Sequence, residues 1–178
     1  MKPAQYLNRL VASLRLKKHP EGGWYREVYR SPENILPRGS FRRFCSPRSV
    51  CTSIYFLLGR GDFSAFHRLR SDEIWHFYEG SNLRLHLLHP KRGYRCLSLG
   101  ERVGRQRQRQ ALIPAGTWFA AELSAGGRFA LLGCTVAPGF DFRDFEMARP
   151  EQLEKNFPRH RALVRRLCRL PTTGKGSA

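Results

Sequence analysis

The feature that most constrains the fold of this chain is a series of short segments rich in β-forming residues, separated by Gly, Pro, Asn or Asp. Their spacing, roughly 8 to 12 residues, is typical of antiparallel sandwiches and barrels. No helical pattern lies between successive segments, although parallel strands need such crossover connections. The series therefore predicts an all-β antiparallel fold, with strands at residues 23–29, 50–58, 64–68, 73–78, 83–88, 94–99, 110–114, 117–122 and 128–136.

Helices are predicted only at the two ends of the chain. Residues 4–16 carry leucine and valine at the spacing of one helix face, and this helix must end before Pro20. Residues 151–156 and 160–170 show a second, shorter helical pattern.

The segments between and beyond these elements are predicted to be irregular. Residues 34–49 contain Pro and Gly and predict a loop, and residues 106–110 predict an exposed hairpin connection. Residues 171–178 hold no large apolar side chain and predict a disordered tail. We therefore expect one domain over residues 1–170, followed by a tail over 171–178.

Length, apolar content and cysteine usage fit an ordinary intracellular domain. A chain of 178 residues with 41% hydrophobic residues is long enough to bury a core. It has no apolar run of membrane-spanning length and no secretory h-region, so we expect a cytoplasmic protein with no membrane partner. The cysteines are odd in number and scattered, which predicts free thiols at Cys45, Cys51, Cys96, Cys134 and Cys168.

The formal net charge of +18 raises the question of nucleic-acid binding, because basic patches displace counterions from phosphates. The arginines are spread along the whole chain, however, and are not gathered on one element. We therefore expect no nucleic-acid partner. Arginine matches phosphate and carboxylate geometry, so a small polar or anionic ligand is favoured instead.

Residues 61–80 place Gly61, His67, Glu73 and Gly80 at intervals of six, six and seven residues. This spacing resembles the first signature of the cupin superfamily, in which a second histidine follows two residues after the first. That position is Leu69 in this chain.

Residues 113–119 resemble the second cupin signature, with Phe119 in the place of its histidine. Further blocks resemble the cupin_5 subgroup, a domain family of unknown function catalogued as predicted sugar epimerases. They lie at residues 19–23, 26–27, 30–31, 71–77 and 133–142. The resemblance implies a cupin double-stranded β-helix, an antiparallel jelly-roll barrel with an N-terminal helix and short C-terminal helices. It also implies a homodimer.

The substituted positions bear on metal binding. Cupin metalloenzymes typically use three histidines and a glutamate, whereas this chain offers only His67 and Glu73 at the matching positions. His76 is a weak third candidate, because strand alternation places it on the face opposite Glu73. We expect no cofactor, or at most a weakly bound divalent metal at His67, Glu73 and His76.

A pocket walled by aromatic side chains is the alternative to a metal centre. Apolar walls with a few polar groups are usual for ligand sites. The candidate substrate-binding residues are Trp75, Phe77, Trp118, Phe119, Arg26 and Arg84. His86 could also line this pocket or be exposed. In the structural alternative the aromatic residues only fill the barrel, and Arg26 pairs with Glu21 to support a turn.

The resemblance favours a metal-independent isomerase or epimerase acting on a nucleotide sugar or a related polar compound. His67 would be the base, Glu73 would orient it, and Tyr55 or Tyr78 would return the proton. Two alternatives stay open: a non-catalytic module that binds a small ligand, and a weakly metal-dependent cupin enzyme.

A homodimer is also expected from the strand at residues 24–30. Its large side chains alternate over both faces, and a one-sided core cannot bury both sets. We therefore expect this strand at or near a two-fold interface.

Overall fold

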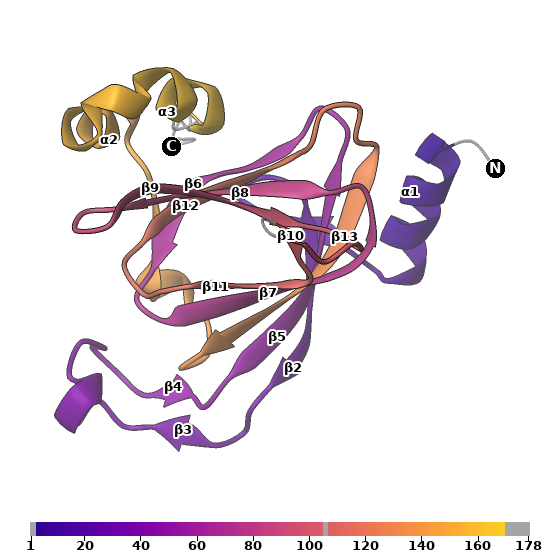
Figure 1. Ribbon diagram of the computed structural model, residues 1–178. Coiled ribbons are helices and arrows are strands. Elements are labelled where there is room, and N and C mark those ends of the chain that lie inside the picture. Colours follow the sequence, from indigo (N-terminus) through magenta and orange to yellow (C-terminus); the bar gives the residue numbers. More distant parts are fainter. Residues whose placement is uncertain (1–2, 105–106, 170–178) are drawn as a thin grey trace, which may run out of the picture.

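The computed structural model describes residues 3–104 and 107–169. Two six-stranded sheets face each other, as Figure 1 shows, with one helix beside one end of the barrel and two short helices over the second sheet. In the described part of the chain, no helix is both long and apolar enough to cross a membrane.

The first sheet has the strand order β1-β2-β5-β13-β7-β11. These strands are β1 (Lys17–Lys18), β2 (Trp24–Arg30), β5 (Thr52–Gly59), β13 (Phe129–Ala137), β7 (Asp72–Gly80) and β11 (Gln110–Ile113). Every pair in this sheet is antiparallel.

The second sheet has the order β10-β9-β8-β12-β6-β14. Its strands are β10 (Arg107–Gln108), β9 (Gly93–Leu99), β8 (Leu83–His89), β12 (Trp118–Leu123), β6 (Phe63–Leu69) and β14 (Phe145–Met147). The pairs are antiparallel except for β10, which lies parallel to β9. The predicted all-β jelly-roll fold is confirmed.

Three apolar clusters hold the layers together. The largest fills the space between the sheets with inward-facing side chains, among them Phe56, Trp75, Phe77, Leu85, Phe119 and Leu132. A second cluster joins the outer face of the second sheet to α2 (Pro150–Asn156) and α3 (Arg161–Leu167). The third joins the first sheet to α1 (Pro3–Ser13).

Two segments differ from the predicted loops. Within residues 34–49 the chain forms β3 (Asn34–Ile35), β4 (Arg48–Ser49) and the short helix η1 (Gly39–Phe41). Two further short helices, η2 (Phe142–Asp144) and η3 (Pro158–His160), follow the barrel strands. Within the predicted hairpin connection over residues 106–110, Arg107 and Gln108 form β10 beside β9, and Gln110 begins β11 of the first sheet. Residue 106 lies outside the described residues. The predicted disordered tail lies outside the described residues, and the domain boundaries stay a prediction.

Candidate functional site

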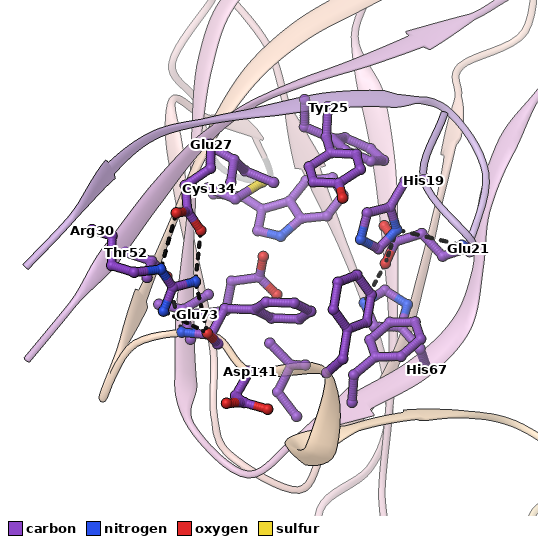
Figure 2. Close-up of a pocket in the computed structure, with 18 of the residues that line it drawn as sticks. His19, Glu21, Tyr25, Glu27, Arg30, Thr52, His67, Glu73, Cys134 and Asp141 are labelled. Atoms are coloured by element: carbon purple, nitrogen blue, oxygen red, sulfur yellow. Dashed lines mark hydrogen bonds and ion pairs between the residues drawn. The ribbon is translucent and has the colours of Figure 1, made fainter. Parts of the chain in front are cut away.

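A cavity of about 410 Å³ opens between the two sheets at one end of the barrel (Figure 2). Its walls come from β1, β2, β5, β7 and β13 of the first sheet, from β6 and β14 of the second, and from the segments at residues 19–21 and 140–142. The residues that line it are Lys17, His19, Glu21, Tyr25, Glu27, Arg30, Thr52, Ile54, Phe56, His67, Leu69, Glu73, Trp75, Cys134, Val136, Phe140, Asp141, Phe142 and Phe145.

His67 reaches this cavity from β6, and only 3% of its side chain is exposed. Its Nδ1 lies 2.7 Å from the carbonyl oxygen of Ala65, which can only accept a hydrogen bond. Its Nε2 lies 3.1 Å from a carboxyl oxygen of Glu21. Burial lowers the pKa of His67 to about 3, outweighing the Ala65 hydrogen bond, so the ring is neutral at pH 7.

Glu21 is the partner of His67, although the sequence pointed to Glu73. Its Oε2 also lies 3.3 Å from Nδ1 of His19, and its Oε1 accepts a hydrogen bond of 2.8 Å from the hydroxyl of Ser64. Burial raises the pKa of Glu21 well above its usual range, and the nearby charge of Glu73 adds to this effect.

The turn at Gly22 and Gly23 brings Glu21 into the barrel. Gly22 has a φ of 114°, and a Cβ there would lie 2.1 Å from the carbonyl oxygen of Phe63. Glycine is therefore required by both conformation and space. The carbonyl oxygen of Glu21 accepts hydrogen bonds from the backbone N–H of Ala65 at 2.8 Å and from Nε of Arg169 at 3.0 Å. These contacts fix Glu21 against the second sheet.

Glu73 enters the cavity from β7, so it belongs to the sheet opposite His67; Figure 2 shows the two on different sides of the cavity. Among the described residues, neither its buried Oε2 nor the buried Nε1 of Trp75 has a hydrogen-bond partner. Burial raises the pKa of Glu73 to about 7, although Trp75 and Cys134 act in the opposite direction. His67 and Glu73 therefore line the same cavity from opposite sheets, but they make no direct contact in the part of the chain described.

The cavity mouth carries charged and aromatic side chains. Arg30 donates hydrogen bonds of 2.9 and 2.7 Å to the two carboxylate oxygens of Glu27. Lys17 also lines the mouth, and its Nζ lies 5.1 Å from the centre of the Tyr25 ring. Phenylalanine rings after β13 complete the rim, from Phe140, Phe142 and Phe145.

The candidate metal ligands His67, Glu73 and His76 do not come together in one site. The Nε2 of His76 lies 3.1 Å from Oγ1 of Thr135. His76 does not line the cavity that holds His67 and Glu73. Across residues 3–104 and 107–169, no group of three or more His, Cys, Asp and Glu side chains is arranged to hold a metal ion.

Some predicted pocket residues lie outside the cavity. Arg26 pairs in register with Tyr55 on the outer face of the first sheet, where Tyr55 packs against the cluster beneath α1 and lies near the Tyr78 ring. Trp118 lies on the outer face of the second sheet, in the cluster beneath the C-terminal helices. Because successive strand residues face opposite sides, these side chains cannot turn inward without a change of register.

Two more polar candidates face outward from β8. Arg84 is half exposed and lies 3.9 Å from Glu122. His86 is buried outside the barrel, with its ring nitrogens 2.9 Å from the hydroxyl of Tyr94 and 3.0 Å from Glu122. Neither residue lines the cavity.

The aromatic candidates that do face inward differ in position. Trp75 lines the cavity, whereas Phe77 and Phe119 belong to the interior core without lining it. The centres of the Phe119 and His67 rings are 4.0 Å apart. Phe119 thus fills the space that the histidine of the second cupin signature would occupy.

Sequence reasoning missed His19 and Glu21 as site residues. Their block, residues 19–23, carries part of the family resemblance, but the sequence suggests no more for Glu21 than a salt bridge with Arg26. Within the described residues, Glu21 makes its side-chain contacts with His19, Ser64 and His67 instead. Glu21 reaches the interior because the chain turns at Gly22, and this turn is seen only in the structure.

With the barrel and its cavity in place, this is a cupin-fold protein. The sequence matches the family described as Cupin superfamily (DUF985), or Cupin_5, over residues 8–148, and the chain belongs to that family.

Relatives agree with this assignment. The chain is 37% identical to protein SO0799 of Shewanella oneidensis, with a TM-score of 0.80, covering 91% of this chain and 96% of that one. It is 32% identical to a hypothetical protein of Leishmania major, with a TM-score of 0.83 and coverage of 92% and 98%. It is 28% identical to the uncharacterized protein YML079W of Saccharomyces cerevisiae over 158 residues, 84% of this chain and 78% of that protein.

A more distant likeness concerns the fold alone. Oxalate decarboxylase of Bacillus subtilis has a TM-score of 0.51 and 15% identity, covering 84% of this chain and 36% of that one.

Proposed function

We propose that this protein is an isomerase or epimerase in which side chains, without a bound metal, move a proton next to a carbonyl group of a small polar substrate. The observation that carries the proposal is the buried carboxyl group of Glu73 in the cavity, whose Oε2 has no hydrogen-bond partner among the described residues. Leaving a buried polar group unpaired costs about 1–3 kcal/mol. A polar ligand that pairs with this oxygen removes the cost.

Glu73 is the proposed base. A general base works best when its pKa lies near the operating pH, and the pKa of Glu73 is raised to about 7. His67, whose pKa is lowered to about 3, is a much weaker base at neutral pH. Tyr55 lies on the outer face of the sheet and is not proposed to return a proton.

A sugar-sized substrate with an anionic group matches the distribution of charge. The interior holds Glu73, whose carboxylate form would repel an anion, whereas Lys17 lines the mouth. A sugar phosphate or nucleotide sugar would then place its ring among the aromatic walls and its phosphate near Lys17.

Solvent deuterium exchange tests this proposal. The protein is incubated in deuterated buffer with a panel of sugar phosphates and nucleotide sugars, and each compound is analysed by mass spectrometry. We expect deuterium to enter at least one compound at carbon, and Glu73→Gln to slow the exchange by roughly 10²- to 10⁴-fold. Arg165→Ala, which changes an exposed ion pair with Glu154 far from the cavity lining, is the matched control.

Two outcomes would argue against the proposal. Exchange at the wild-type rate in Glu73→Gln would remove Glu73 as the base. A compound that raises the thermal stability of both wild type and Glu73→Gln, without any exchange, would support the non-catalytic binding module instead.

A further inference from the structure

Three polar atoms from two segments, the turn at residues 19–21 and strand β6, converge on one point of the cavity wall. Oε2 of Glu21 lies 3.1 Å from Nε2 of His67 and 3.3 Å from Nδ1 of His19. The side chains of all three residues are at most 6% exposed. Water therefore contributes little to their solvation, so each close contact among them needs a proton on one atom and a lone pair on the other.

The tautomer of each histidine follows from its second contact. Nδ1 of His67 faces the carbonyl oxygen of Ala65 at 2.7 Å, so it carries a proton and leaves a lone pair on Nε2. Nδ1 of His19 accepts a weak hydrogen bond of 3.4 Å from the backbone N–H of Glu21, so its proton is on Nε2. The lone pair on Nε2 of His67 thus faces Oε2 of Glu21, and Nδ1 of His19, 3.3 Å from the same oxygen, brings no proton to it.

If Glu21 were ionised, Oε2 of Glu21, Nε2 of His67 and Nδ1 of His19 would meet with no proton on any of the three atoms. Such an arrangement is repulsive in a buried site, whereas a single proton on Oε2 turns the contact with His67 into a hydrogen bond. We infer that Glu21 holds this proton in the resting protein and is the catalytic acid that acts opposite Glu73. The second half of this inference rests on the proposed function.

The groups around Glu21 are consistent with a protonated carboxyl. The Ser64 hydroxyl donates to Oε1 and leaves Oε2 to the histidines. Burial and the charge of Glu73 raise the pKa of Glu21, which outweighs the opposing effects of Ser64 and Arg169. On the histidine side, burial and Lys17 lower the pKa of His19 to about 4.

In the reaction, the carboxylate of Glu73 takes the carbon-bound proton next to the carbonyl group. The electron pair of that C–H bond forms the enediol double bond, and the proton of Glu21 passes to the carbonyl oxygen. Glu21 is then a carboxylate, and it recovers a proton from the other enediol hydroxyl, on the carbon that lost its hydrogen, where the carbonyl group of the product forms. Glu73 delivers its proton to the former carbonyl carbon as the enediol double bond is lost, and both side chains regain their initial states.

The resting proton can be tested without a substrate. In protein carrying ¹³C-labelled glutamate and ¹⁵N-labelled histidine, infrared and NMR spectra at about pH 8, above the pKa of Glu73, report the carboxyl and ring protons directly. We expect one protonated carboxyl signal, which disappears in Glu21→Gln and persists in Glu73→Gln. We also expect His67 to carry its proton on Nδ1 and His19 on Nε2.

Two other results would contradict the assignment of this proton to Glu21. An ionised Glu21 beside a doubly protonated His67 would show an ordinary ion pair, and the proton would then belong to the histidine. Tight uptake of added Zn²⁺ that shifts both ring signals would show a metal site in place of a proton site. The spectra of wild type decide between these outcomes even if Glu21→Gln does not fold.

The catalytic role is tested in the deuterium-exchange assay. We expect Glu21→Gln to slow the exchange by roughly 10²-fold or more, whereas Arg165→Ala has no effect. Wild-type exchange in Glu21→Gln would refute the acid role and leave Glu73 as the base. Absence of exchange in the wild type would instead refute the proposed function, while the spectra would still decide where the proton lies.

Discussion

Glu73 illustrates how burial changes the chemistry of one side chain. Its carboxyl group faces Glu21 and His67 across an aromatic cavity, and its Oε2 has no hydrogen-bond partner among the described residues. The loss of hydration raises its pKa from the ordinary 4.5 to about 7. The same property that makes Glu73 a candidate base therefore links the stability of the fold to pH.

We predict that Glu73→Gln removes a pH-dependent part of the stability. The folded protein binds the Glu73 proton more tightly than the unfolded chain, so this stabilisation is complete below pH 4.5 and is lost as the pH rises through about 7. At 1.36 kcal/mol per pKa unit, the loss is about 3 kcal/mol.

Urea unfolding of wild type and Glu73→Gln at about pH 4 and about pH 8 measures this difference. The wild type should lose about 3 kcal/mol more of its free energy of unfolding than the variant between these two pH values. Equal losses in the two proteins would show that Glu73 titrates normally in the fold. Titratable groups that do not interact with Glu73 contribute equally in the two proteins, so their effects cancel.

At the scale of elements, strand alternation groups residues by face but does not say which face points inward. The resemblance to cupins implies that His67 and Glu73 face the interior, and both line the cavity, whereas alternation sets His76 on the opposite face from Glu73. No such guide exists for Trp118 and Tyr55, which are predicted site residues but lie outside the barrel. Both residues are apolar enough for either face, because the terminal helices cover the outside of the barrel there.

The C-terminal helices make this outer face a second core. Leu153 of α2 is 2% exposed and packs in the cluster that contains Phe66 and Trp118. We predict that Leu153→Ala destabilises the protein by about 2–5 kcal/mol, through lost burial and the cavity that remains.

Chemical denaturation and hydrogen exchange measure this effect, with Lys155→Ala on the exposed side of the same helix as the control. Exchange should increase first in residues 150–169. A variant as stable as the control would show that α2 is not part of the cooperative fold.

At the scale of the whole molecule, the first sheet has an incompletely covered edge. The two-residue strand β1 pairs only with Trp24 and Tyr25, so the rest of β2 has no neighbour on that side within the described chain. Val28 and Tyr29 of the same strand are 45% and 50% exposed. Open edges tend to be paired or covered.

The homodimer therefore stays a prediction, with β2 at or near the interface. Light scattering at micromolar protein should report about twice the 20.6 kDa chain mass. Association should tighten with salt, because the net charge of +18 opposes it. Val28→Lys should give a monomer, and a wild type that stays monomeric at high concentration and high salt would contradict the prediction.

The sequence by itself determined the antiparallel β fold and the positions of its main strands to within a few residues. These properties depend on local periodicity and on turn residues, which lie close together along the chain. The inward direction of His67 and Glu73 follows from the resemblance to cupins. Only the tertiary structure decided that Glu21 reaches His67, because this contact spans two segments and requires a glycine turn at Gly22. The pKa values of these groups were also beyond the sequence, since they depend on burial between two sheets that no local pattern describes.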